Sequence, residues 1–159
     1  MKSKLNRFLV CFSLLILLTG CGEVQRGIDK PVRVGGNRIV INHVRKTSEY
    51  TPKSLEISIS TTGESILVVV DGEILGSVNQ DLCNTPAFNG VELRWYDLSL
   101  FTRTRRLHCG LFPDDKRFVL LFSIPQKAID ELFTLYFPDE DISVRLWKSD
   151  LWDDKLINY

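Results

Sequence analysis

The sequence is poor in the residues and motifs on which most enzyme chemistry depends. Among its 159 residues there are only two histidines, His43 and His108, and no serine lies in a Gly-x-Ser-x-Gly elbow. There is no Gly-x-x-x-x-Gly-Lys phosphate loop and no Cys-x-x-Cys pair. The acidic clusters lack the regular spacing of oxygen ligands that a calcium loop requires. These absences predict a protein that is not an enzyme, with no cofactor, metal or small-molecule substrate.

The sequence also lacks an excess of charge of either sign, since 20 lysines and arginines balance 20 aspartates and glutamates. A protein that binds nucleic acid usually carries a clear basic excess over its surface. We therefore expect no nucleic-acid partner. The balance is uneven along the chain, with basic residues gathered between positions 26 and 53 and acidic residues between 139 and 154.

The amino-terminal segment has the pattern of a secretory signal. Three basic residues precede the apolar run Phe8–Leu18, which is too short to span a bilayer as a helix. The following Leu18-Thr19-Gly20-Cys21 resembles a bacterial lipobox, and the resemblance implies cleavage before Cys21 and acylation of its thiol. The alternatives are an ordinary signal peptide cut elsewhere and an anchor that is never cut.

Lipidation of Cys21 would hold the protein permanently on the periplasmic side of a membrane, because several acyl chains give stable anchoring. In the Gram-negative lipoproteins that this signal resembles, an aspartate after the cysteine favours retention in the inner membrane. Gly22 occupies that position, so we expect the outer membrane. The predicted organisation is a signal peptide over 1–20, a lipidated tether over 21–30 and a single periplasmic domain over 31–159.

Two further cysteines, Cys83 and Cys109, fall within the predicted domain. In an oxidising periplasm such an isolated pair usually forms a disulfide. The alternative is a metal site that also uses His108, although neighbouring residues of a strand point to opposite faces.

The hydrophobic pattern predicts a mostly β fold, an antiparallel sheet or sandwich, with one amphipathic helix near the carboxyl terminus. Several segments alternate or run continuously apolar in the manner of strands. They comprise a hairpin at 31–44 around Gly35-Gly36, a meander at 55–78 that turns at Asp71-Gly72, and single strands at 91–96, 117–123 and 142–147. The segment 102–106 is interpreted as an edge strand protected by charge, with a binding patch as the alternative.

The helix is predicted from Pro125 to Tyr136. Pro125 suits a first turn, and apolar residues recur at helical spacing through Ile129, Leu132 and Phe133. Pro138 would end it.

Two surfaces are candidates for binding. The basic residues Arg26, Lys30 and Arg33 lie near the predicted anchor and could contact anionic lipid headgroups. At the other end of the chain, acids interleaved with aromatic residues are the candidate surface for protein recognition, with a core role for the tryptophans as the alternative. This set comprises Trp147, Asp150, Trp152, Asp153, Asp154 and Tyr159.

The layout of lipobox, short tether, early hairpin and cysteine pair resembles periplasmic lipoproteins assigned an immunity role in type VI secretion. The likeness rests on this layout and on residues 30–42, and it transfers no binding residues. Those proteins commonly carry a cysteine in the first strands, where this sequence has Arg38 and Ile39. The sequence thus predicts a lipid-anchored, non-enzymatic binding protein that neutralises another protein. The alternative is a structural or assembly lipoprotein of a secretion or pilus system.

Overall fold

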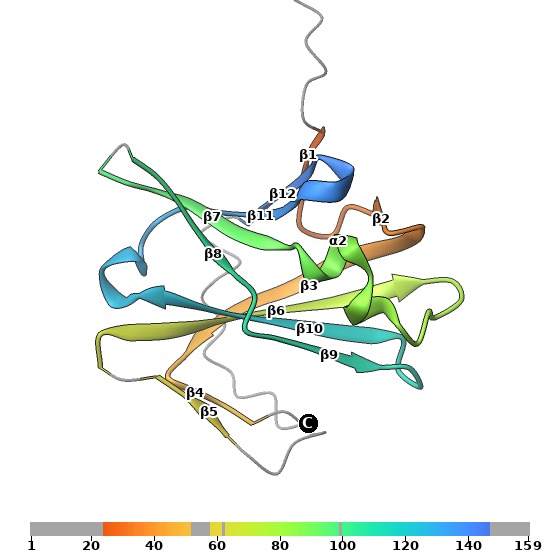
Figure 1. The fold of residues 1–159 in the computed structure, drawn as a ribbon, viewed down its shortest axis with the longest axis horizontal. Coiled ribbons are helices and arrows are strands. Elements are labelled where there is room, and N and C mark those ends of the chain that lie inside the picture. Colours follow the sequence, from red (N-terminus) through yellow and green to blue (C-terminus); the bar gives the residue numbers. More distant parts are fainter. Residues whose placement is uncertain (1–23, 52–57, 62, 99, 147–159) are drawn as a thin grey trace, which may run out of the picture.

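The computed structural model describes residues 24–51, 58–61, 63–98 and 100–146, which form mostly antiparallel β structure arranged as a β-sandwich (Figure 1). Sheet A has the strand order β1-β12-β11-β7-β8, sheet B has the order β2-β3-β6-β10-β9, and β4 and β5 form a small separate ribbon. The strands of sheet A are β1 (Val24–Gly27), β7 (Glu92–Asp97), β8 (Leu100–Arg105), β11 (Phe133–Phe137) and β12 (Ile142–Leu146). Those of sheet B are β2 (Val32–Val34), β3 (Asn37–Thr47), β6 (Ser65–Leu75), β9 (His108–Phe112) and β10 (Arg117–Pro125). The ribbon consists of β4 (Glu49–Tyr50) and β5 (Ile59–Ser60).

The centre of sheet B is formed by β6 and β10, which pair from Arg117↔Glu73 to Pro125↔Ser65. The runs Ile66–Val70 of β6 and Phe118–Phe122 of β10 are continuously apolar, as expected for segments that are covered on both faces. One face carries Val68, Val70 and Phe122 into the core between the sheets. The opposite face forms a second, smaller cluster of Leu67, Val69, Val119 and Leu121, with Tyr50, Ile59 and Phe112 packed against it.

Aromatic side chains fill the core between the two sheets. Phe88 makes an edge-to-face contact with Phe118 at 5.3 Å between ring centroids and lies 5.6 Å from Phe137. Trp95 packs similarly against Phe133 at 5.8 Å. Each such pair contributes about 0.5–1.5 kcal/mol beyond the burial of its area. The two contacts of Phe88 join β11 of sheet A to β10 of sheet B through the short helix α2 (Pro86–Asn89), whereas the Trp95–Phe133 contact lies within sheet A.

The predicted turn at Asp71-Gly72 is wrong, because β6 runs straight through both residues. Gly72 is required there by close packing. A Cβ at this position would overlap the ring of Phe118 and lie 2.8 Å from the carbonyl oxygen of Val40. The dipeptide that is typical of a hairpin turn therefore marks a close approach of a ring to the backbone in a central strand.

The predicted amphipathic helix from Pro125 to Tyr136 is also wrong. A 3₁₀ turn, η2 (Gln126–Ala128), follows Pro125, and the chain then forms β11. Along β11, Phe133, Leu135 and Phe137 are buried while the residues between them are only partly covered, which is the period of a strand. Pairing with β12 on one side and β7 on the other outweighs the helical spacing.

Other predictions are confirmed. The first hairpin is formed by β2 and β3, with positive φ at Gly35 (57°) and Gly36 (77°). The disulfide between Cys83 and Cys109 is present and joins the 3₁₀ turn η1 (Leu82–Asn84) to β9.

Two boundaries differ from expectation. Residues 24–27, assigned to the tether by sequence, form β1 and pair in parallel with β12. The segment after Ser99 divides into β8, at the edge of sheet A, and β9, at the edge of sheet B. Within the described part of the chain, no helix has the length and apolar character needed to cross a membrane.

Candidate functional site

The outer face of sheet A carries an ordered layer of arginine and aromatic side chains. Strand register places these residues together, because directly paired residues of antiparallel strands share a face. Glu92 pairs with Arg105, Arg94 with Arg103, and Tyr96 with Phe101, whereas the alternate residues Leu93 and Trp95 point into the core. We call this layer the arginine–aromatic face, and it comprises Glu92, Arg94, Tyr96, Phe101, Arg103, Arg105 and Tyr136.

Glu92 is the organising residue of this face. Its side chain is only 9% exposed, and its two carboxylate oxygens accept from different arginines. Arg94 donates to Oε2 and Arg103 to Oε1, each at 3.0 Å. Because charge-assisted bonds are short and directional, this carboxylate fixes the positions of two guanidinium groups.

The guanidinium of Arg94 lies over aromatic rings from both neighbouring strands. Its Cζ is 3.2 Å from the ring centroid of Tyr136 and 5.3 Å from that of Phe101. Phe101 in turn contacts Tyr96 edge to face, with centroids 6.0 Å apart. The result is a continuous layer across β11, β7 and β8, stabilised by cation–π attraction.

Tyr136 is held at the rim by a hydrogen bond from its hydroxyl to Asp141, at 2.8 Å. This bond, together with partial burial, raises the pKa of the Tyr136 hydroxyl. The phenol therefore stays protonated, and its ring faces Arg94 as a neutral partner at physiological pH.

The face is basic overall. Among the described residues, Glu92 and Asp141 are the acids of this side, and both already have partners on the face. The arginines there are Arg94, Arg103 and Arg105, with Arg145 on β12 in register with them. Arg103 keeps 61% of its side chain exposed while it is paired with Glu92, and Arg105 makes no ion pair among the described residues. An ordered, exposed array of arginines and aromatics has the composition of a protein-binding hot spot.

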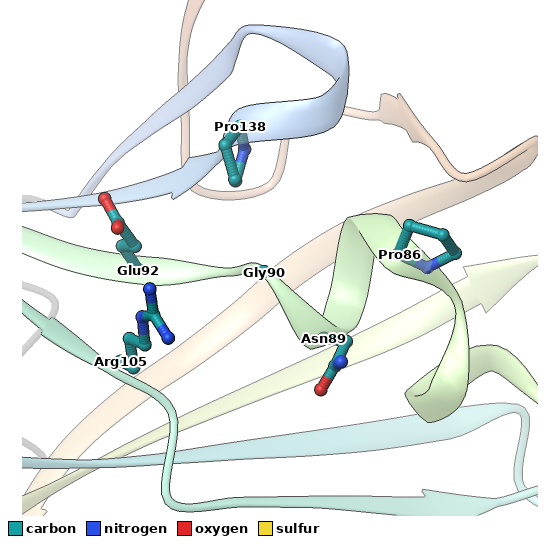
Figure 2. Close-up of a pocket in the computed structure, with 6 residues that line it drawn as sticks. All are labelled: Pro86, Asn89, Gly90, Glu92, Arg105 and Pro138. Atoms are coloured by element: carbon teal, nitrogen blue, oxygen red, sulfur yellow. The ribbon is translucent and has the colours of Figure 1, made fainter.

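A shallow hollow adjoins one end of this face, between β7, α2 and the turn η3 (Pro138–Glu140) (Figure 2). It has a volume of about 490 Å³ and is lined by Pro86, Asn89, Gly90, Glu92, Arg105 and Pro138. In Figure 2 the Arg105 side chain extends from β8 toward β7. The hollow thus extends the surface that Glu92 and Arg105 already share with the arginine–aromatic face.

A second hollow, of about 330 Å³, lies beside the hairpin of β2 and β3. Arg33 and Arg38 are directly paired across the strands and both line it. Like charges in this position repel each other, which favours an anion between them. The turn of this hairpin is linked to η3, which precedes β12, by a hydrogen bond from the Gly35 amide to Glu140.

The structure brings together only some of the residues predicted from sequence. Cys21 and the acidic, aromatic set from Trp147 to Tyr159 lie outside the described residues. Arg26 lies in β1, and Lys30 and Arg33 are exposed.

The two histidines lie on different strands of sheet B, and His43 is paired directly with the buried Asp71 of β6. His43 is exposed on β3, while His108 is partly covered on β9. Burial and the nearby Arg106 charge lower the pKa of the His108 imidazole, so it is neutral at physiological pH. No group of three or more metal-ligating side chains occurs in the described part of the chain.

The arginine–aromatic face was missed by sequence reasoning, although its signal was present. Glu92, Arg94 and Tyr96 alternate in one strand, and Phe101, Arg103 and Arg105 alternate in the next. The second set was interpreted mainly as an edge strand protected by charge. The edge position of β8 is confirmed. Arg103 and Arg105 of this edge strand also belong to the arginine–aromatic face.

Comparison with known proteins gives the fold alone. No family model and no curated protein matches this chain. A crystal structure of an uncharacterized β-sandwich protein from Clostridium difficile 630 is similar, with a TM-score of 0.53 and 11% identity over 78% of this chain and 94% of that one.

Proposed function

We propose that the protein is a lipid-anchored periplasmic binding protein, without enzymatic activity, that masks or neutralises another protein. The observation that carries this proposal is the arginine–aromatic face, an exposed surface on which Arg94, Arg103 and Tyr136 are held in place before any partner arrives. Side chains that are already fixed lose little conformational freedom on binding, so more of the contact energy appears as affinity.

The charge of this face favours an acidic partner. Arg103 and Arg105 project from the edge strand, and the sole carboxylate among the paired residues of β7 and β8 on this side is the buried Glu92. Complementary charge of this kind accelerates association and discriminates against basic proteins. The predicted acidic segment from Trp147 to Tyr159 would instead suit a basic partner, and it stays a separate prediction.

The membrane side of the proposal rests on the lipobox and on the position of β1. Val24 lies three positions after Cys21, so the start of the fold would be at most about 11 Å from the acylated cysteine. The arginine pair of the second hollow, Arg33 and Arg38, lies on the hairpin linked to this end and would contact lipid phosphates.

Capture from cells tests the protein partner. The tagged full chain is purified from membranes in mild detergent and compared with the variant Arg103→Ser/Arg105→Ser. The matched control is Arg33→Ser/Arg38→Ser, which removes the same charge from the other sheet. We expect an acidic soluble protein to be retained by the wild type and the control and lost from the first variant.

Two results would count against this function. Retention of an integral membrane complex, unaffected by either variant, would favour the assembly lipoprotein. Mass spectrometry that finds no acyl chains on Cys21 would remove the lipid anchor from the proposal.

A further inference from the structure

We infer that the tip of the β7–β8 hairpin is an apolar plug that inserts into a recess on an acidic protein. This inference rests on the proposed function and specifies how the partner is held. The tip is defined by Tyr96, Leu98, Leu100 and Phe101 at the end of the hairpin. Tyr96 and Phe101 share the arginine–aromatic face, whereas Leu100 is paired with Asp97 and lies on the opposite face of the hairpin.

These four side chains are unusually exposed for large apolar residues. Leu98 is 91% exposed, Leu100 72%, Tyr96 63% and Phe101 52%. A single exposed leucine needs no explanation, but four large exposed side chains at the end of one hairpin, two of them in contact, mark an interaction site.

The backbone at Leu98 adds a second and independent observation. Asp97 pairs with Leu100, so position 98 begins the turn, and its φ is +49°. Glycine or asparagine adopts this left-handed conformation readily, whereas leucine is strained there. A leucine that is both strained and solvated lowers stability and solubility, and such residues are typical of sites where function requires them.

The position of the tip favours a protein over the membrane that would hold the lipid anchor. Beyond Leu93 and Arg94, β7 pairs with β8 alone, so the hairpin projects past β11 (Figure 1). Tyr136 pairs with both Glu92 and Ser143, which places the start of β7 beside the start of β1 and β12. Leu98 lies six residues beyond Glu92, which corresponds to about 20 Å at the rise of a strand. The tip is therefore remote from the end of the fold that follows the predicted anchor.

The occupant is identified by charge. Arg103 and Arg94 lie next to the tip on the same face, and Lys127 at the tip's other side is paired with Asp97 at 2.7 Å. A recess rimmed by carboxylates would bind the apolar side chains in its floor and the arginines at its rim. We therefore assign the tip to an acidic protein with an apolar pocket.

Site-specific photo-crosslinking in the protein's own cells tests this assignment. A benzophenone amino acid is placed at position 98 of the full chain, or at position 107, where Leu107 is another exposed apolar residue at 57%. We expect one acidic protein to crosslink at position 98 and not at position 107. The variant Arg103→Ser/Arg105→Ser should reduce that crosslink at least tenfold.

A second variant, Leu98→Asn, separates binding from folding. Because asparagine accepts positive φ, this change should raise the Tm of the purified full chain by a few degrees, while capture of the crosslinked protein falls at least tenfold. The inference would be overturned if Leu98→Asn were less stable than the wild type, or if it captured the partner as well as the wild type does.

Crosslinking of position 98 to lipid alone would overturn it as well, as would equal crosslinking from position 107. The proposed function is tested separately. If loss of Arg103 and Arg105 abolishes capture while Leu98→Asn does not, the plug is refuted and the binding protein stands. If the wild type retains no protein and the chain with benzophenone at position 98 forms no crosslink, both are refuted.

Discussion

Removal of the disulfide should cause a large and calculable loss of stability. Cys83 and Cys109 are 26 positions apart and tie η1 to the edge strand β9. In the chain-entropy model, opening a loop of this size costs about 3.5 kcal/mol of unfolding free energy. Native stabilities are commonly about 5–15 kcal/mol, so the variant Cys83→Ser/Cys109→Ser should fold and be much weaker.

Urea unfolding measures this loss. Trp95 is 3% exposed in the core and provides a fluorescence signal for global unfolding. With a urea dependence of about 2 kcal/mol per molar, the midpoint should fall by about 1.7 M. Reduction of the wild type with dithiothreitol should give the same shift, which serves as the control for the two serines.

A shift below about 0.5 M with unchanged β-sheet circular dichroism would refute this reasoning. It would mean that the loop is already restricted without the bond. The hydrogen bonds from Arg106 to the Cys83 carbonyl, at 2.7 Å, and to Asn89, at 3.1 Å, are the contacts that would then hold it.

Three further predictions concern single residues. Gly72→Ala should lower the unfolding free energy by about 2–3 kcal/mol, because its methyl group meets the Phe118 ring, whereas Gly63→Ala, with open space around it, should change little in the same urea assay. Glu92→Gln should lower the unfolding free energy by about 2 kcal/mol, because two charge-assisted hydrogen bonds are weakened and the one to Arg103 is largely exposed. The control is Glu64→Gln at an exposed position. Equal stability of the two variants would contradict the organising role of Glu92. Burial raises the pKa of Asp71 above its ordinary 3.8, although the charges of Arg45, Arg117 and His43 oppose this shift. The unfolding free energy of the wild type should therefore fall, relative to that of Asp71→Asn, as the pH rises from 3.8 through the raised pKa. A difference between the two proteins that does not change with pH would contradict this prediction.

Local sequence patterns predicted the strands well where one residue pattern had one structural meaning. The apolar run Ile66–Val70 forms the first half of β6, and the alternation over 91–96 corresponds to β7. Gly35-Gly36 forms a turn with positive φ, as its composition requires. In each case the local preference and the tertiary environment agree, so the sequence alone was sufficient.

The two errors of fold arose where a pattern had two meanings. Asp71-Gly72 has the composition of a hairpin turn, yet the absent Cβ of Gly72 is used to admit the Phe118 ring. The segment Phe133–Phe137 has apolar residues at both helical and strand spacing, and only its pairing with β7 and β12 decides between them. Such choices depend on residues far away in the sequence.

The candidate site was missed for a related reason. The sequence shows that Arg94 and Arg103 alternate with other residues, but only the register of β7 with β8 places them opposite each other over Glu92. Tyr136 joins the face from a segment that had been predicted as helix. An error in one strand therefore hid a surface that three strands build together.

The two sheets differ in a way that explains where recognition can occur. The outer side of sheet B carries a buried apolar cluster that includes Leu67 and Leu121, so its surface contributes to stability. The outer side of sheet A instead exposes charge and aromatic rings held by one buried carboxylate, Glu92. Because Phe133 and Trp95 anchor the same strands in the core, the outer residues can change without unfolding the sandwich. We therefore expect substitutions on the arginine–aromatic face, apart from Glu92, to alter binding far more than stability.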